Sequence, residues 1–291
     1  MTHDTSESTR PLVFAHRGSS AAFAEHTRAA YLQALADGSD GVECDVHLTR
    51  DQQVVLLHDS TLDRTSDGTG PVADRTLEEL RALDFSSWKG ARVPEAYGAK
   101  SEQFLTLPEL LDLLRGAGRP ISLAIELKHP SPFAFKLEDR VLDILLAEGW
   151  TPESSAVDNI SVTFMSFDPD ATKYLLGKIP GTFICQLVAD VDVAELREGM
   201  GLGALSGSAV ANVMKAAQAE GEQLLDNSQV GLAGPGIDYV RQHARTVQRW
   251  LESGRRFRVW TVDDERDVAL CQGLGIHEIT TNKPARVLAQ L

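Results

Sequence analysis

The stretch Gly41–Thr49, GVECDVHLT, is apolar and β-branched, yet it carries two carboxylates two residues apart, Glu43 and Asp45. A second stretch, SLAIELKH, repeats this spacing with Glu126 and Lys128. Side chains two apart on a strand point to the same face. Both stretches therefore predict two charged groups side by side on one wall of a sheet. Because buried carboxylates are usually paired or bound to a metal, the pattern indicates a functional cluster.

Two histidines end other apolar runs, His16 in VFAHRGS and His58 in VVLLHDS. Histidine donates or accepts a proton near neutral pH, and the planar fork of Arg17 matches a phosphate. The alternative is structural: satisfied core histidines, an arginine in a surface salt bridge, and Lys128 as an ion-pair partner of Glu126. Taken together, the residues favour a divalent metal, a phosphate, and an acid and a base that cut a phosphoester.

The three carboxylates in these stretches offer hard oxygen ligands, which suit Mg²⁺ or Ca²⁺ better than zinc. They are Glu43, Asp45 and Glu126. The alternative is that the glutamates are surface residues on half-exposed strands. The shared spacing and the nearby lysine favour the metal site.

Composition excludes several classes of partner. The chain has 291 residues, 43% of them hydrophobic, and a formal net charge of -14, which argues against a nucleic-acid backbone or a polybasic membrane surface. The three cysteines lie in apolar stretches, so we expect buried free thiols in a reducing compartment. The first residues have no apolar core, and no run approaches the ~18 apolar residues of a membrane span. We therefore expect a cytoplasmic protein without a membrane anchor, whose residues 1–10 form a flexible tail.

Short apolar runs alternate with helical patterns, which is typical of an α/β fold with a mostly parallel sheet. The expected strands are Leu12–Ala15, Gly41–Leu48, Val54–Leu57, Ile121–Leu127, Val162–Ser166, Thr182–Leu187, Gln229–Ala233, Phe257–Val262 and His277–Thr281. The main expected helices are Thr27–Ala36, Leu107–Arg115, Lys136–Ala147, Asp168–Leu176, Tyr239–Glu252 and Glu265–Leu274.

One connection departs from this alternation. Only Arg50–Gln53 separates the second and third strands, whereas a parallel crossover needs roughly a dozen residues or more. These two strands are therefore predicted to form an antiparallel hairpin that places position 45 opposite about 57. The hairpin brings His58 close to Glu43 and Asp45.

Without the third strand, eight strands are left, the number for a closed (β/α)8 barrel, whose chemistry lies at the C-terminal ends of the strands. A doubly wound open sheet is the alternative. The turn-rich residues 60–106 are predicted to be an insertion over the barrel mouth, within a single domain that spans 11–291. Trp260 is expected to pack at the barrel rim, and its functional interpretation is an apolar wall for the non-phosphate group of a substrate. The stretch Gly199–Gln223 is weakly patterned, and we assign it no role.

Several segments, in their order and spacing, resemble the glycerophosphodiester phosphodiesterase family. They are AHRGSS, EHT at 25–27, ECDVHLTRD, HDSTLDRTSDGTG, IELK, SFD at 166–168 and VWTVDD. The resemblance implies a TIM barrel of the phospholipase-C-like phosphodiesterase type with a small insertion after the HD strand. It also implies metal-dependent hydrolysis of glycerophosphodiesters to glycerol 3-phosphate and an alcohol.

The resemblance implies a role for each matching position. It gives His16 and His58 as general acid and base, Glu43, Asp45 and Glu126 as metal ligands, Arg17 and Lys128 as phosphate contacts, and Glu25 as a further residue near the metal. Two positions depart from the family pattern. His26 stands where the family usually has asparagine, and Asn282 stands where it usually has aspartate.

Two other functions fit parts of the pattern. A phospholipase D or C acting on lysophospholipids would need an apolar mouth, which Phe85, Trp88, Val93 and Tyr97 could form. A non-catalytic barrel that binds a phosphorylated ligand would need none of the acid and base residues. Since every residue that the chemistry needs is present, hydrolysis of glycerophosphodiesters is the function we expect.

Overall fold

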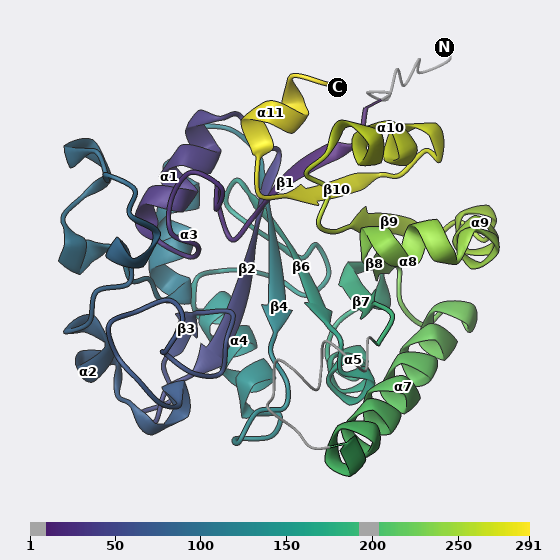
Figure 1. The fold of residues 1–291 in the computed structure, drawn as a ribbon, viewed down its shortest axis with the longest axis horizontal. Coiled ribbons are helices and arrows are strands. Elements are labelled where there is room, and N and C mark those ends of the chain that lie inside the picture. Colours follow the sequence, from purple (N-terminus) through teal and green to yellow (C-terminus); the bar gives the residue numbers. More distant parts are fainter. Residues whose placement is uncertain (1–9, 192–203) are drawn as a thin grey trace.

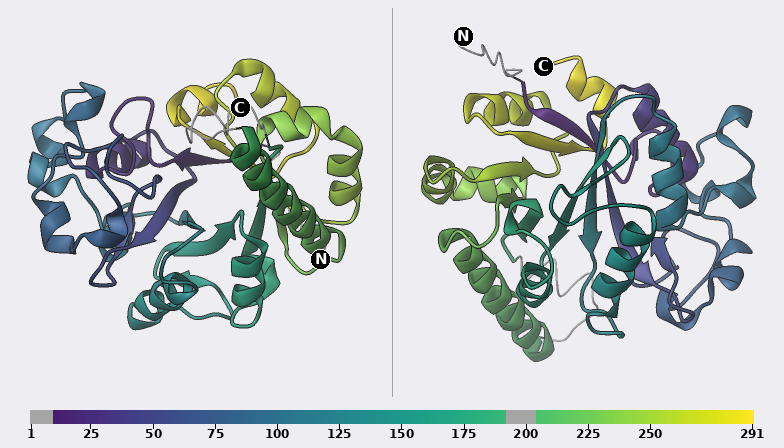
Figure 2. Two further views of the ribbon diagram at one scale, coloured as in Figure 1. Left: turned by 60° about the horizontal axis from the view of Figure 1, so that its bottom comes forward. Right: turned by 180° about the vertical axis from the view of Figure 1, so that it is seen from behind.

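The fold is an α/β barrel, seen in a computed structural model that describes residues 10–191 and 204–291 (Figure 1). Eight of the described strands run parallel in the order β1-β10-β9-β8-β7-β6-β4-β2, and pairing of β1 with β2 closes the ring. The helices lie outside the strands (Figure 2). The predicted closed barrel is confirmed, and the open sheet is excluded.

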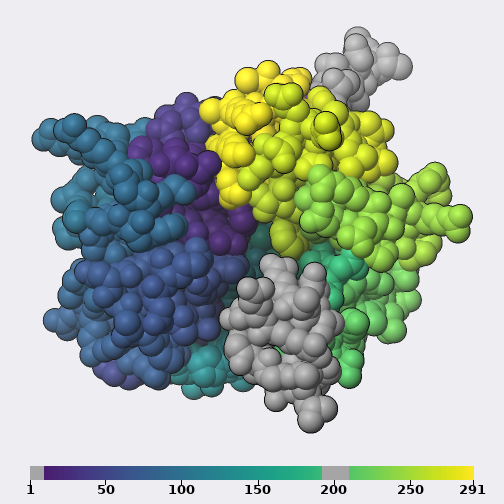
Figure 3. Space-filling model, viewed as in Figure 1, coloured from purple at the N-terminus to yellow at the C-terminus, as the bar shows by residue number. Residues whose placement is uncertain are grey.

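The barrel strands largely match the expected runs. They are β1 (Leu12–His16), β2 (Gly41–Leu48), β4 (Ile121–Leu127), β6 (Ile160–Ser166), β7 (Ile184–Val188), β8 (Leu232–Pro235), β9 (Arg256–Val259) and β10 (Glu278–Thr281). The two ends of the barrel sequence meet where Ala15 of β1 pairs with Thr281 of β10. On the surface, Figure 3 shows an early part of the described chain, in purple, beside its C-terminal part, in yellow.

Alternation along the strands sorts side chains to two faces. Val13 and Ala15 of β1 belong to the large core between the strands and the surrounding helices. Phe14, between them, belongs to a smaller cluster with residues of β4, β6, β7 and β8. On β2, Val42 and Cys44 likewise join the outer core. The period of two therefore turns the carboxylates of β2 toward the barrel interior.

The predicted hairpin is confirmed. Strand β3 (Val54–Leu56) pairs antiparallel with β2, with Val46 opposite Leu56. The backbone N–H of Leu57 donates to the carbonyl of Asp45 over 3.2 Å, so position 45 does face position 57. The short loop thus delivers the chain after β3 to the barrel mouth.

The segment after β3 has a small core of its own. Leu57, Leu62, Leu80, Phe85 and Phe104 belong to it, and the rings of the two phenylalanines stack at 4.2 Å. Its short helices are η1 (Val72–Asp74), α2 (Leu77–Arg81), η2 (Ser87–Lys89), η3 (Glu95–Tyr97) and η4 (Lys100–Glu102). Its description as an insertion within a single domain 11–291 stays a prediction.

Five of the outer helices begin at, or one residue after, the position expected from the sequence. Thr27 caps α1, and Thr106 forms a capping box with Glu109 at the start of α3. Asp168 caps α5 ahead of Pro169. The outer helices are α1 (Arg28–Ala36), α3 (Leu107–Arg115), α4 (Lys136–Ala147), α5 (Pro169–Leu176), α7 (Ala204–Asp226), α8 (Ile237–Gln242), α9 (Ala244–Glu252), α10 (Glu265–Gly273) and α11 (Pro284–Leu288), with η5 (Gly181–Phe183) before β7.

Three local predictions need correction. The helix expected over Tyr239–Glu252 is broken at His243 into α8 and α9. A short strand, β5 (Ala156–Val157), pairs antiparallel with β6 and was not expected. The stretch without an assigned role, Gly199–Gln223, becomes helix α7 from residue 204, and its earlier part lies outside the described residues.

The remaining expectations concern the chain start, the thiols and the membrane. Up to residue 9 the predicted tail lies outside the described residues, whereas Arg10 pairs with Asp40 at 2.7 Å. Cys44, Cys185 and Cys271 are buried free thiols, as predicted. None of the helices in the described ranges combines the length and the apolar character that a membrane crossing requires.

Candidate active site

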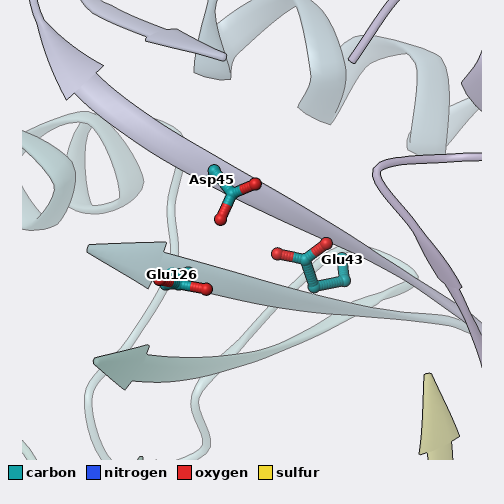
Figure 4. Close-up of side chains that lie close together, drawn as sticks. All are labelled: Glu43, Asp45 and Glu126. Carbon is teal, nitrogen blue, oxygen red and sulfur yellow. The ribbon is translucent and has the colours of Figure 1, made fainter. Parts of the chain in front are cut away.

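Neighbouring strands bring the predicted polar residues to one level of the barrel. In the register of β1 with β2, His16 lies beside Glu43, and in that of β2 with β4, Asp45 lies beside Glu126. The three carboxylates point toward one another from β2 and β4 (Figure 4). One oxygen of each lies within 4.8 Å of the others, so the three residues could hold a metal ion.

Burial sets the charge state of this cluster. Glu43 is 1% exposed, and burial together with the charge of Asp45 raises its pKa well above its usual range. Burial also raises the pKa of Glu126, to about 7. Although burial opposes ionisation of Asp45 too, the charges of Lys128 and of nearby groups lower its pKa well below the ordinary value. The carboxylates of the cluster therefore outnumber the cations that could neutralise them.

Two buried oxygens of the cluster lack hydrogen bonds. They are Oε1 of Glu43 and Oδ1 of Asp45, the latter 3.1 Å from Nζ of Lys128 in an ion pair. Buried carboxylate oxygens without donors are costly unless a cation neutralises them. The donor set and the unpartnered Oε1 of Glu43 fit a hard divalent cation.

Two cations flank the carboxylates. Lys128 lies between Asp45 and Glu126, with Nζ 2.7 Å from Oε1 of the glutamate. Arg17 donates its backbone N–H to Glu43 over 3.0 Å, and its side chain contacts Asp45 and Glu25, each at 3.0 Å. Both cations line the central cavity, so they can face an anionic ligand there.

His16 is held in one tautomer. Its Nδ1 lies 2.8 Å from Oδ1 of Asn282, whose own Nδ2 donates to Asp263 over 2.7 Å. Because the amide N–H is committed to a carboxylate, the amide oxygen faces the ring and Nδ1 must be the donor. Burial, helped by the charge of Arg17, lowers the pKa of His16 to about 4. Its Nε2 is therefore an unprotonated acceptor at neutral pH.

His58 has a different partner. Its Nδ1 lies 2.7 Å from Oδ1 of Asp59. The hydrogen bond from His58, together with Arg64, holds the pKa of Asp59 well below its ordinary value, so the partner is a carboxylate. The second histidine therefore has a negative charge behind its ring, whereas the first has a neutral amide.

These groups surround a cavity of about 140 Å³. Its other wall is apolar and comes from β6, β7 and the segment after β9. Trp260 belongs to this wall; its Nε1 donates to the carbonyl of Gly234 over 2.8 Å, and its ring meets Phe167 edge-on at 5.4 Å. The lining comprises His16, Arg17, Glu43, His58, Glu126, Lys128, Met165, Phe167, Leu187, Arg258, Trp260, Thr261 and Thr280.

Two predicted residues lie behind the cavity. Glu25 is not among its lining residues; it binds Arg17 and Arg64, which lower its pKa to about 2 against the opposing effect of burial. Asp45 is also behind the lining, where Oδ2 accepts from Nε2 of His26 at 2.9 Å. His26 thus supplies a buried hydrogen-bond donor to this carboxylate.

Sequence reasoning did not identify several supporting residues. Asp59 and Arg64 both lie in HDSTLDRT, a stretch whose resemblance had been noted without a role for either residue. Asp263 and Asn282 follow β9 and β10, at the C-terminal face where barrel chemistry is expected. Their position after a barrel strand was therefore the only sequence feature that could have indicated a role for Asp263 and Asn282. The partners that these residues bind depend on the fold.

Comparisons with known proteins identify the family. Residues 16–286 match the model of the glycerophosphoryl diester phosphodiesterase family. The chain is 34% identical over 282 residues to a probable glycerophosphodiester phosphodiesterase 1 of Mycobacterium tuberculosis, covering 97% of this chain and 92% of the relative. It is 30% identical over 273 residues to a putative glycerophosphodiester phosphodiesterase of Bacillus subtilis, covering 94% of each.

Solved structures share the fold. A phosphodiesterase of Oleispira antarctica, in complex with the product sn-glycerol-3-phosphate, superposes with a TM-score of 0.70 at 22% identity, over 97% of this chain and 96% of that one. A glycerophosphodiester phosphodiesterase of Thermotoga maritima gives 0.67 at 19% identity, over 97% and 99%. With the family match over nearly the whole chain, these findings show that the chain belongs to the glycerophosphoryl diester phosphodiesterase family and is a hydrolase of that class.

Proposed function

We propose that this protein hydrolyses glycerophosphodiesters to glycerol 3-phosphate and an alcohol, with a divalent metal and two histidines. The observation that carries the proposal is that two histidines, the cations Arg17 and Lys128, and two of the three clustered carboxylates line the same cavity. A phosphodiester needs each of these: charge neutralisation, an acceptor for the nucleophile's proton and a donor for the leaving oxygen.

The proposed metal ligands are Glu43, Asp45 and Glu126. Their hard oxygens suit Mg²⁺ or Ca²⁺, and the buried Oε1 of Glu43, which has no hydrogen-bond partner, supports this assignment. A bound divalent cation would supply Lewis-acid stabilisation of the developing charge and lower the pKa of a hydroxyl. Arg17 and Lys128 would bind the phosphate oxygens from the same side of the cavity.

The surroundings of the two histidines assign their roles. His16 is neutral, its Nδ1–H is fixed by Asn282, and its Nε2 accepts the proton of the attacking hydroxyl. His58 has the carboxylate of Asp59 at its Nδ1, and it donates a proton to the leaving alcohol. The different partners of the two rings, an amide and a carboxylate, support different roles for the two histidines.

The two remaining predicted residues, Trp260 and Glu25, have supporting roles in this proposal. Trp260 offers an apolar surface for the non-phosphate part of the substrate, because its only polar atom is occupied by Gly234. Glu25 holds Arg17 from behind and thereby orients the guanidinium toward the phosphate.

The lysophospholipid alternative has little support. Its predicted apolar mouth depends on residues that are used elsewhere: Phe85 is buried in the small core, and Tyr97 donates to Gln33 and packs against Phe23. Neither of these aromatic residues is among the residues that line the described cavity, and the same holds for Trp88 and Val93.

The test is release of glycerol 3-phosphate from glycerophosphocholine, glycerophosphoethanolamine and glycerophosphoinositol, in EDTA and with added Mg²⁺ or Ca²⁺. We expect release that EDTA abolishes and one of the two metals restores. Folded protein that releases no product with either metal, yet cleaves a lysophospholipid, would replace this proposal with the alternative.

A further inference from the structure

Arg64 joins two carboxylates that come from different parts of the chain. Its Nη1 and Nη2 donate to the two oxygens of Glu25 over 2.9 and 2.7 Å. Its Nε and Nη2 donate to the two oxygens of Asp59 over 2.6 and 3.0 Å. The planar guanidinium thus makes a paired contact with each carboxylate, the geometry in which arginine binds most strongly.

Each of these carboxylates holds a residue of the cavity. Asp59 accepts from Nδ1 of His58 at 2.7 Å, and Glu25 accepts from Arg17 at 3.0 Å. Arg64 itself is not among the lining residues. It therefore lies one contact behind the proposed general acid on one side and one contact behind the proposed phosphate ligand on the other.

We propose that Arg64 is a positioning residue, which aligns His58 through Asp59 and Arg17 through Glu25. This inference rests on the proposed function, in which His58 protonates the leaving alcohol. Asp59 is half-exposed and has only this arginine and the histidine as side-chain partners among the described contacts. Without the fork of Arg64, the carboxylate is free to rotate and the imidazole loses its fixed orientation.

The contribution should be catalytic more than structural. The side chain of Arg64 is 44% exposed, and ion pairs at exposed positions add little to stability. Proton transfer, in contrast, depends steeply on the alignment of the donor. Loss of Arg64 is therefore expected to lower turnover while leaving folding and metal binding nearly unchanged.

Two substrates with different leaving groups distinguish a positioning role of Arg64 from a general loss of structure. An aliphatic alcohol such as choline leaves only when it is protonated, whereas p-nitrophenolate leaves without a proton. We would measure kcat and KM of Arg64→Gln and Arg64→Lys on glycerophosphocholine and on the p-nitrophenyl ester of glycerol 3-phosphate. Arg81→Gln is the matched control, because Arg81 is 40% exposed, pairs with Glu109 in the described part of the chain, and is not among the residues that line the cavity.

We expect kcat of Arg64→Gln on glycerophosphocholine to fall about 10- to 100-fold, with a much smaller fall on the aryl ester. KM should rise equally for both substrates, through Arg17. Arg64→Lys should resemble Arg64→Gln, because a point charge cannot hold two carboxylates in paired contacts. Metal affinity, measured by titration calorimetry, and the control variant should match the wild type.

Equal losses of kcat on both esters, or no loss on either, would overturn the inference. A second variant tests the connection directly: if Arg64 acts on the leaving group through Asp59, Arg64→Gln adds little to the loss of kcat caused by Asp59→Asn. Full additivity would contradict the proposed route. Failure of the wild type itself to cleave either ester would instead remove the proposed function on which the inference rests.

Discussion

Nδ1 of His16 lies 2.8 Å from Oδ1 of Asn282, across the seam that closes the barrel. The contact follows from the strand register. β1 pairs with β10 so that Ala15 lies opposite Thr281, and His16 and Asn282 are the residues that come next in the chain. Asp263 fixes the amide by accepting from its side chain and from its backbone N–H. The seam therefore gives His16 a neutral amide partner.

The first prediction concerns that neutral partner. In Asn282→Asp, a negative charge at Nδ1 favours the protonated ring, so the pKa of His16 rises from about 4. Because the base must be unprotonated, the acidic limb of the pH–rate profile moves to higher pH. We expect lower kcat/KM at about pH 5 and a nearly unchanged value at about pH 8, measured on glycerophosphocholine.

The control for this change is Asn227→Asp, the same substitution at an exposed position beyond α7. The new carboxylate at 282 also faces Asp263, so a thermal melt should show lower stability for the site variant only. A profile of Asn282→Asp that overlays the wild type would argue against His16 as the base.

The second prediction concerns His26, which has a backbone φ of 60° and donates to Asp45. Asparagine tolerates this conformation and also carries a donor, so His26→Asn should keep activity within several-fold of the wild type. His26→Ala loses the donor and leaves Tyr31 without its ring partner. We expect weaker metal binding by about 10- to 100-fold for the alanine variant alone.

Titration calorimetry with Mg²⁺ or Ca²⁺ measures this difference without relying on turnover. Tyr31→Phe is the control, since it removes the other contact of the same ring and leaves the donor to Asp45 in place. Equal metal affinity in the alanine variant and the wild type would show that His26 has no part in holding the carboxylate.

Local patterns in the sequence were enough to predict the barrel and the central residues. The spacing of Glu43 and Asp45 fixed their common face because a strand has a period of two. The short loop after β2 predicted the pairing of position 45 with 57, which the Leu57 hydrogen bond confirms. These features depend only on neighbours in the chain.

What the sequence could not supply depends on contacts between distant segments. Arg64 reaches Glu25 across 39 residues, and Asn282 reaches His16 across 266, so neither partner is visible in a local window. Helix α7 was missed because its Gly- and Ala-rich start carries no regular apolar stripe. The helix break at His243 could not be predicted, because no proline or glycine stands at the break.

The third prediction contrasts two carboxylates of the cluster. Burial and the nearby Asp45 raise the folded-state pKa of Glu43, so its contribution to stability is present below the unfolded pKa and is lost as pH rises. In EDTA near neutral pH, Glu43→Gln should therefore be more stable than the wild type, by about 1–3 kcal/mol. Each kcal/mol corresponds to a shift in Tm of about 2–4 °C.

Asp45→Asn should do the opposite. Asp45 is paired with Lys128, Arg17 and His26, so removal of its charge leaves buried cations with fewer partners and costs about 3 kcal/mol. Added Mg²⁺ or Ca²⁺ should raise the Tm of the wild type and of neither variant, as thermal melts with and without metal would measure. A metal-induced shift that survives in Glu43→Gln would remove Glu43 from the proposed ligands.

The last prediction separates the two histidines by chemistry. His16→Ala and His58→Ala should each lower turnover of glycerophosphocholine by about 10²- to 10⁴-fold, because each loses one proton transfer. Metal affinity should stay at the wild-type value, since neither ring is a proposed ligand. On the p-nitrophenyl ester only His58→Ala should recover, because that leaving group needs no acid while the nucleophile still needs His16.

The control is His243→Ala, which changes a histidine paired with Asp190 and should match the wild type on both esters. Recovery of His16→Ala in place of His58→Ala would reverse the two assigned roles, and the carboxylate behind His58 would then have to support a base.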